Sequence, residues 1–268
     1  MFGLTDKVFG HHRGIDEAMV GVSYGDDSPG YLEQRPEQGA GWIARYAQGQ
    51  DYHKYVRKML IRFAKAIARE PGLGGDSKDH RVFVDTGPLL EKAYAHLAGI
   101  GWIGKNSLLI NRKLGSWLFL GAILTPLELA PDKPAVDHCG TCTRCLDACP
   151  TSAFPEPYVL DARRCIATWT IESPDPVADI VAEELGQHLF GCDICQEVCP
   201  WNRKAPDSTH LPLLPRPENV RPRLDPFFGM TDTEFRDRFP GSAVRRTDAG
   251  RMGAIARLIA SKDDEAEV

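Results

Sequence analysis

The clearest pattern of hydrophobic and polar positions lies between Tyr52 and Arg69. Apolar residues recur there at three- and four-residue intervals, with lysine and arginine between them, which predicts an amphipathic helix. Pro71-Gly72 follows and predicts the end of that helix. The next stretch, Arg81 to Asp85, is rich in valine and phenylalanine and predicts a short strand before a turn.

The rest of the chain is patterned less evenly. No element is predicted before Trp42, because this part is rich in glycine and only weakly periodic. Proline-rich stretches predict a linker at Pro126–His138 and an extended segment at Pro206–Pro226. The other predicted elements are helices at Leu89–Leu97, Thr231–Phe239 and Gly250–Ser261 and strands at Leu108–Asn111 and Trp117–Thr125. This mixture of strands and helices predicts an α+β or α/β layered fold.

Composition narrows the class of protein. The chain has 268 residues, of which 43% are hydrophobic, so we expect it to fold around a core. Its net charge of −5 argues against a protein that coats nucleic acid. It has no run of about 18 apolar residues, and its first residues lack a basic stretch followed by an apolar run. We therefore expect a cytoplasmic protein without a membrane segment.

Eight cysteines carry the strongest chemical signal. In the cytosol thiols stay reduced, so metal or redox chemistry is favoured over disulfides. A C-x2-C-x2-C-x3-C-P run, which is the bacterial ferredoxin signature, is followed by a partial copy and by one isolated cysteine. The first run is Cys139, Cys142, Cys145 and Cys149-Pro150, the partial copy is Cys192, Cys195 and Cys199-Pro200, and the isolated cysteine is Cys165.

Together these cysteines predict two [4Fe–4S] clusters in interlocked loops. In the ferredoxin pattern the fourth cysteine of a run binds the other cluster, and the same crossing here uses every cysteine once. The predicted ligands are Cys139, Cys142, Cys145 and Cys199 for cluster one and Cys149, Cys165, Cys192 and Cys195 for cluster two. Two zinc sites would also use eight thiolates, but this spacing is unusual for zinc.

Three stretches outside the cysteine runs resemble the epoxyqueuosine reductase family. They are RYAQGQDYHKYVRKM (45–59), VDTGPLLEKAYAHLAGIGWIGKNSLLI (84–110) and GSWLFLGAILT (115–125). With the two cysteine runs, the likeness extends from about Trp42 to Arg257. The resemblance implies a cobalamin-dependent iron–sulfur enzyme, related in fold to reductive dehalogenases, that reduces epoxyqueuosine to queuosine in the anticodon loop of tRNA.

The resemblance also implies a domain organisation and partners. Residues 1–131 would form a partial α/β cobalamin-binding catalytic domain, residues 132–205 a dicluster ferredoxin-like domain, and residues 206–268 a Pro-rich segment with C-terminal helices. Compared with the family the chain looks shortened at both ends. We expect a monomer that receives electrons from a low-potential donor such as a flavodoxin or ferredoxin.

Site residues follow from the same resemblance. Asp85, the aspartate of the family's V-D-x-G-P segment, would be the proton donor; the alternative is an aspartate that only caps the next helix. The cobalamin would be lined by the glycine-rich loop, through Gly101, Trp102, Gly104, Lys105, Asn106 and Ser107. His53 is expected on the helix face or against RNA rather than on cobalt. For four basic residues the sequence leaves two alternatives, contacts with phosphate or a solvated helix face. These residues are Arg45, Lys54, Arg57 and Lys58.

Two rival functions remain. A reductive dehalogenase-like enzyme would use the same chemistry, but those proteins usually carry export signals. An iron–sulfur electron-transfer module without its own catalysis would keep the clusters and lose the substrate. Uptake of cobalamin discriminates the carrier from the enzymes.

Overall fold

The computed structural model describes residues 7–11, 17–26, 28–34, 37–69 and 76–265. Contacts group the chain into two compact units. The first unit comprises Met1–Asp26, Tyr52–Cys142 and Pro200–Pro212, and the second comprises Asp27–Asp51, Thr143–Cys199 and Leu213–Val268. The units follow contacts rather than chemistry, so the three-part division into functional domains stays a prediction.

A four-stranded antiparallel sheet organises the first unit. Its strand order is β1 (Lys7–His11), β2 (Glu17–Ser23), β7 (Leu118–Leu124) and β4 (Arg81–Phe83). The sequence pattern placed no element before Trp42, whereas β1 and β2 lie there. Strand β2 lies inside the sheet and its last residues are buried on both faces, so it lacks the apolar–polar alternation that would have revealed it.

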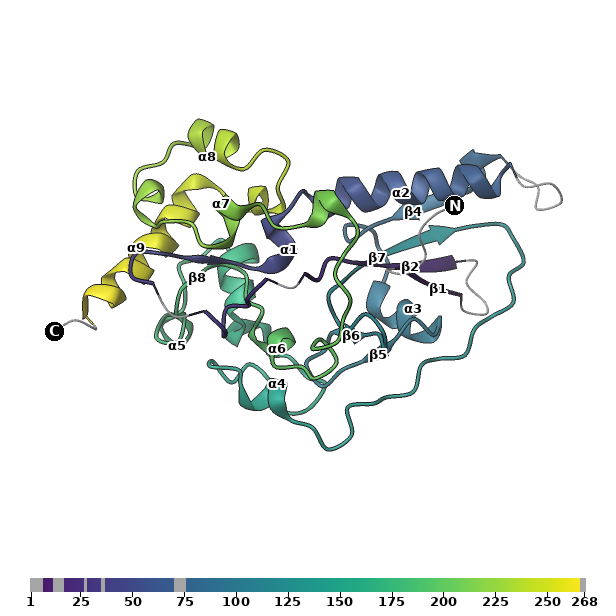
Figure 1. Cartoon of the computed structure of the whole chain (residues 1–268), viewed down its shortest axis with the longest axis horizontal. Coiled ribbons are helices and arrows are strands. Elements are labelled where there is room, and N and C mark those ends of the chain that lie inside the picture. The colour runs from purple at the N-terminus through teal and green to yellow at the C-terminus, as the bar shows by residue number, and fades with distance from the viewer. Residues whose placement is uncertain (1–6, 12–16, 27, 35–36, 70–75, 266–268) are drawn as a thin grey trace. The chain divides into compact units, whose positions relative to one another are not determined.

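Helices cover the two faces of this sheet (Figure 1). Helix α2 (Tyr52–Ile67) packs on the face that carries Gly121, where an added Cβ would lie 2.8 Å from Leu60 Cδ1. The next residue, Ala122, points to the opposite face and joins a buried cluster with Ala95 of α3 (Glu91–Leu97). The predicted helix at 52–69 is confirmed to within two residues. The predicted end signal, Pro71-Gly72, lies outside the described residues.

A small hairpin follows α3. Its strands are β5 (Trp102–Ile103) and β6 (Leu109–Ile110). The glycines before and after β5 permit close packing inside the hairpin, because a Cβ on Gly101 would lie 2.3 Å from Ile110 O and one on Gly104 would lie 2.4 Å from Ile110 Cδ1. The 3-10 turn η1 (Ser77–Asp79) precedes β4.

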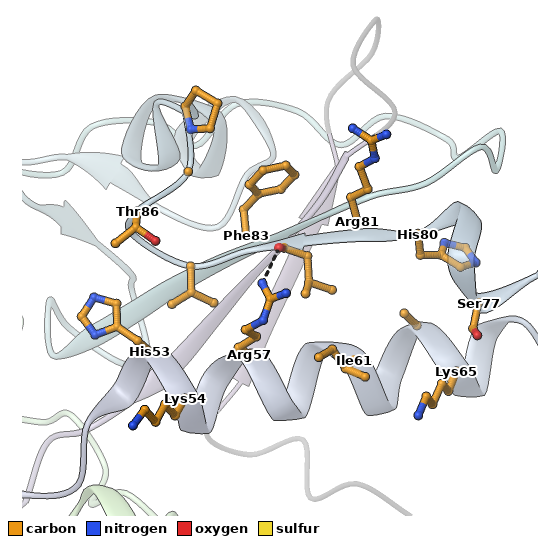
Figure 2. Close-up of a pocket in the computed structure, with 15 residues that line it drawn as sticks. His53, Lys54, Arg57, Ile61, Lys65, Ser77, His80, Arg81, Phe83 and Thr86 are labelled. Atoms are coloured by element: carbon orange, nitrogen blue, oxygen red, sulfur yellow. Dashed lines mark hydrogen bonds between the residues drawn. The ribbon is translucent and has the colours of Figure 1, made fainter. Parts of the chain in front are cut away.

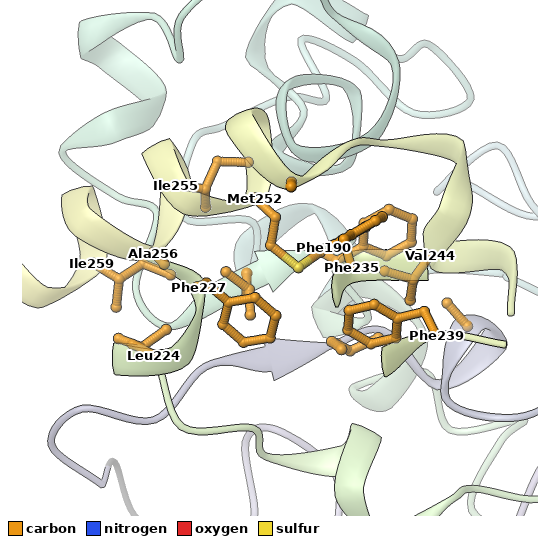
Figure 3. Close-up of a cluster of buried hydrophobic side chains, with 14 of the residues drawn as sticks. Phe190, Leu224, Phe227, Phe235, Phe239, Val244, Met252, Ile255, Ala256 and Ile259 are labelled. Carbon is orange, nitrogen blue, oxygen red and sulfur yellow. The ribbon is translucent and has the colours of Figure 1, made fainter. Parts of the chain in front are cut away.

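The second unit is built around a hydrophobic core (Figure 3). A parallel pair, β3 (Trp42–Ile43) and β8 (His188–Phe190), contributes Ile43, Leu189 and Phe190. Helices α8 (Asp232–Arg238) and α9 (Ala249–Glu265) pack against it through side chains such as Phe235 and Met252. Thr231 and Glu234 form a capping box at the start of α8, so both predicted C-terminal helices are confirmed.

Short elements complete the chain. They are α1 (Arg45–Gln48), α4 (Arg144–Asp147), η2 (Ala162–Arg164), η3 (Thr168–Glu172), α5 (Asp179–Ala182), α6 (Ile194–Glu197), η4 (Leu211–Leu213), α7 (Pro217–Val220), η5 (Asp225–Phe227) and η6 (Ala243–Arg246). The prediction of an extended segment at 206–226 is wrong in part, since η4, α7 and η5 interrupt it. Pro217 and Pro226 occupy the first turns of α7 and η5, where a missing N–H costs little. Within the described residues, no helix is long and apolar enough to span a membrane.

Candidate iron–sulfur and catalytic sites

Two similar cysteine loops lie fifty residues apart in the second unit. Cys145 lies in the one-turn helix α4 and Cys195 in the one-turn helix α6. Each helix is followed by a turn that carries another cysteine, Cys149 or Cys199, and then by proline. The same backbone hydrogen bond closes both turns, from Cys149 N to Leu146 O and from Cys199 N to Gln196 O. The repeated spacing therefore produces a repeated local structure.

Five thiols of the second unit interact electrostatically. Burial raises the pKa of Cys195, and the neighbouring Cys165, Cys145, Asp193 and Cys149 raise it further. Burial likewise raises the pKa of Cys192 well above its usual value, with Cys195 and Cys165 adding to the effect. The Cys165 thiol has a raised pKa because of burial and nearby Cys149. Cys149, Cys165, Cys192 and Cys195 are the predicted ligands of cluster two and Cys145 is a predicted ligand of cluster one; metal binding would relieve the cost of charging these thiols together.

None of the eight cysteines forms a disulfide in the structure. Among the described residues, no three His, Cys, Asp or Glu side chains lie close enough together to hold one metal ion. The choice of two cubanes over two zinc sites therefore rests on the spacing of the cysteines.

A buried carboxyl anchors the second cysteine loop. Asp193 lies between Cys192 and α6 and is 1% exposed. Its Oδ2 accepts hydrogen bonds from Arg45 N at 2.7 Å and from Trp42 Nε1 at 3.3 Å. Burial raises the pKa of Asp193 to about 7. The loop is therefore tied to the segment around β3, a link that the spacing of the cysteines did not reveal.

The two cysteines in the first unit are held by residues of the β5–β6 hairpin. Trp102 Nε1 donates to Cys139 Sγ at 3.4 Å. Lys105 Nζ donates to Gly140 O at 2.7 Å and to Cys142 O at 3.0 Å. Trp102 is 2% exposed and packs against Trp201 with ring centroids 5.0 Å apart. An N–H···S bond of this kind helps to set the reduction potential of an iron–sulfur cluster.

The structure gives the predicted cobalamin loop these contacts within the chain. Gly101 and Gly104 pack on Ile110, and Lys105 and Trp102 reach the segment 139–142. Asn106 is buried and its Oδ1 accepts from Leu108 N, while Ser107 O accepts from Lys92 Nζ. The loop therefore braces the first cysteine segment, and its role toward a corrin stays a prediction.

Asp85 is brought together with His53 at the end of β4. Asp85 Oδ2 lies 2.9 Å from His53 Nε2, although 32 residues separate them. The Asp85 backbone has a φ of 58°, a left-handed conformation that aspartate tolerates better than most residues. Glu91 stabilises it by accepting a hydrogen bond from Asp85 N at 2.6 Å. Asp85 therefore does not cap α3 through its side chain; the N-cap of that helix is Leu90 and has no side-chain cap.

Glu91 adds a second carboxyl to this corner. The pKa of Glu91 is raised, and burial is the largest cause. The hydrogen bond from the Asp85 backbone opposes this rise, and the Asp85 carboxylate adds to it. Sequence reasoning did not single out Glu91, and it placed His53 on the helix face or against RNA. The parts that Glu91 and His53 play at this corner depend on tertiary structure, because His53 can meet Asp85 only when α2 packs beside β4.

Arg45 is not part of a surface for phosphate. It is 7% exposed, and its guanidinium donates to Ser28 O at 2.5 Å and to Ser28 Oγ at 3.2 Å. Lys54, Arg57 and Lys58 are exposed on α2.

Two family models match parts of the chain. A 4Fe-4S double cluster binding domain matches residues 138–202, so the cysteine loops and this match define an iron–sulfur protein. A second model, described as epoxyqueuosine reductase QueG, DUF1730, matches residues 18–86. That range covers nearly all of β2, together with α2, β4 and the His53–Asp85 pair.

Curated relatives show to which family of iron–sulfur proteins the chain belongs. An epoxyqueuosine reductase from Xanthomonas campestris is 44% identical over 230 residues, covering 85% of this chain and 63% of the relative. One from Synechocystis is 44% identical over 209 residues, covering 77% of this chain and 71% of the relative. The chain belongs to the epoxyqueuosine reductase family. It spans about three fifths to three quarters of the length of these relatives and others.

Solved structures agree with this assignment. A selenomethionine-labelled epoxyqueuosine reductase matches 94% of this chain with a TM-score of 0.82 at 31% identity, and 66% of that protein is covered. An epoxyqueuosine reductase crystallised with an epoxyqueuosine-modified tRNA-Tyr stem loop matches with a TM-score of 0.80 at 31% identity. A Bacillus subtilis structure, TM-score 0.78 at 30% identity, has a catalytic aspartate loop swung out of the active site.

Proposed function

We propose that this chain reduces epoxyqueuosine to queuosine in the anticodon loop of tRNA. The observation that carries the proposal is the hydrogen-bonded His53–Asp85 pair in a chain with a dicluster domain and 44% identity to epoxyqueuosine reductases. The solved relative bound to a modified tRNA stem loop supports the choice of substrate. A cytoplasmic location, a monomeric state and a flavodoxin or ferredoxin as electron donor stay predictions.

The reaction converts an epoxide into an alkene and releases water, which requires two electrons and two protons. No common side chain donates electrons, so cofactors must supply them. When bound, the two [4Fe–4S] clusters and the cobalamin that the family resemblance implies would supply this reducing power. The protein itself has to bind the nucleotide, exclude water and deliver protons to the oxygen that leaves.

In this proposal Asp85 donates the proton. It lies at a strand end, where side chains commonly project into a site. His53 holds the carboxyl through Nε2, and Glu91 holds the backbone through Asp85 N. Both contacts restrict Asp85 to one orientation, and a general acid must be within hydrogen-bonding reach of its acceptor. His53 is half-buried and can pass a proton onward to Oδ2 as solvent re-protonates the pair.

The proposed cluster ligands are those expected from the crossed ferredoxin pattern. Cys149, Cys165, Cys192 and Cys195 would hold cluster two, and Cys165 interacts electrostatically with each of the other three. Cys139, Cys142, Cys145 and Cys199 would hold cluster one. Trp102 and Lys105 would keep the 139–142 segment in place.

The test uses the whole chain reconstituted anaerobically with iron, sulfide and cobalamin. It is mixed with a chemical reductant and a stem-loop RNA that carries epoxyqueuosine, and the nucleoside product is identified by mass spectrometry. The expected product lacks one oxygen atom relative to the substrate. A chain that keeps both clusters and corrin but leaves the nucleoside unchanged would overturn the proposal.

Corrin binding separates the enzyme from a simple electron carrier. The reconstituted protein is desalted and its corrin content is measured by absorbance. Retained corrin supports the enzyme. Protein that keeps its iron but loses all corrin would instead favour an electron-transfer module.

A further inference from the structure

A basic groove extends along α2 in the first unit, beginning beside the His53–Asp85 pair (Figure 2). We call it the α2 groove; it has a volume of about 720 Å³ and lies against α2, β4 and the turn after β4. His53 and Thr86 lie at one end, and Ser77 and His80 lie at the other. One end of the groove therefore holds His53, the hydrogen-bond partner of the proposed proton donor.

The charged side chains that line the α2 groove are all positive. Its lining includes Lys54, Arg57, Lys65 and Arg81 and contains no aspartate or glutamate. All four cations are exposed. Within the part of the chain that the structure describes, none of them forms an ion pair with a carboxylate. Arg57 donates instead to Val82 O on the edge strand at 3.2 Å, which fixes its guanidinium in the groove.

The far end of the groove contains an unsatisfied buried polar group. His80 is 7% exposed, and neither of its ring nitrogens has a hydrogen-bond partner among the described residues. Buried polar groups are nearly always paired, so an unpaired imidazole in the lining favours a polar ligand at this end of the groove. Both ring nitrogens are themselves buried, so a ligand oxygen would reach them only after the side chain turns toward the groove.

We propose that the α2 groove binds the sugar–phosphate backbone of the RNA substrate next to the reacting nucleotide. The inference rests on the proposed function, which requires a tRNA loop at Asp85. Lys54 and Lys65 are eleven residues apart on α2, about 16 Å along the helix at 1.5 Å per residue. That length suits several consecutive phosphates. Cations in such a track position RNA without reading its bases.

An acidic electron-donor protein is the competing occupant of a basic groove. The geometry favours RNA, because the groove leads to the acid that must touch the substrate, and an electron donor has no need of that acid. The experiment therefore measures RNA affinity and electron delivery separately.

The test compares the wild-type chain with Lys54→Gln/Lys65→Gln. Binding of a synthetic, unmodified anticodon stem-loop RNA is measured by fluorescence anisotropy between 50 and 200 mM salt. Each phosphate contact contributes about −0.7 to the slope of log affinity against log salt for single strands, so across this fourfold range the wild type should lose about sevenfold more affinity than the variant. Arg112→Gln/Lys113→Gln is the control, since both residues are exposed in the same unit and outside the groove.

The outcomes decide the inference separately from the proposed function. A reduced salt slope in the groove variant and a wild-type slope in the control support it, even if the chain fails to reduce epoxyqueuosine, because the assay involves no turnover. Equal slopes in the wild type and the groove variant overturn it, as does an equal loss in the control. An unchanged RNA affinity with slower reduction of the clusters by an acidic flavodoxin would assign the groove to the electron donor and overturn the inference.

Discussion

The cysteine loops and the His53–Asp85 pair are built in opposite ways. In the loops, the predicted ligands lie three or four residues apart and are placed by one-turn helices, so their arrangement is determined locally. The His53–Asp85 pair joins α2 to the end of β4 across 32 residues and exists only once the sheet has formed. The loops depend on spacing, whereas the pair depends on tertiary packing.

This difference predicts different responses to substitution. A lost cluster ligand should remove a whole cofactor, since no other cysteine is available to replace it. A substitution in the His53–Asp85 pair should leave the cofactors in place and alter only proton delivery. The predictions below test this separation from the largest expected effect on turnover to the smallest.

Cys165→Ser should abolish turnover and halve the iron content. Each cubane needs four ligands, and Cys165 is the isolated cysteine that completes cluster two in the predicted pairing. Iron and acid-labile sulfide analysis, with electron paramagnetic resonance of the reduced protein, should show one remaining cluster.

Cys145→Ser tests cluster one in the same way and should leave only the electron paramagnetic resonance signal of cluster two. If Cys165→Ser and Cys145→Ser lose the same spectroscopic species, the crossed ligand assignment is wrong. Full iron content in Cys165→Ser would exclude that cysteine as a ligand.

Asp85→Asn should lower turnover by about 10²- to 10⁴-fold, the usual contribution of a general acid. Asparagine also tolerates the left-handed backbone at this position, so the fold and iron content should be retained. Single-turnover assays of epoxyqueuosine reduction measure the effect, and Asp207→Asn, an exposed aspartate of the same unit, is the control. Turnover within a few-fold of wild type would exclude Asp85 as the donor.

The same contrast explains what the sequence revealed. The α2 helix and the Thr231 capping box were predictable because their signals lie within a few residues of one another. The grouping of Cys149 with Cys165 and Cys192 stays a prediction, and it too rests on a sequence rule, the crossed ferredoxin pattern, rather than on knowledge of the fold.

Interactions across the fold were not predictable. Strand β2 is buried in mid-sheet and shows no alternation, and His53 has no local feature that marks it as the partner of Asp85. Lys105 and Trp102 were assigned to a corrin from the resemblance, yet the structure directs both to the 139–142 segment. Knowledge of where the hairpin packs was required to see these contacts.

His53→Phe should lower turnover about fivefold, because it removes one hydrogen bond that orients Asp85, worth about 1 kcal/mol. Phenylalanine keeps the stacking of this ring on Tyr52, at 4.0 Å between centroids. We expect normal iron content and normal RNA affinity, so the loss would lie in kcat rather than in binding. His53→Gln retains a donor and should recover part of the activity; equal losses in both variants would show that His53 acts through packing alone.

Trp102→Phe should change turnover least and the reduction potential of cluster one most selectively. The indole N–H donates to Cys139 Sγ at 3.4 Å, and such a bond stabilises the more negative, reduced cluster. Phenylalanine keeps the aromatic packing but removes the donor, so the midpoint potential should become more negative in a spectroelectrochemical titration. Trp201→Phe is the matched control, because Trp201 packs edge to face against Trp102 and no indole bond to a cysteine is found for it among the described residues. Equal shifts in both variants would assign the effect to packing, and no shift in Trp102→Phe would show that the N–H does not tune the cluster.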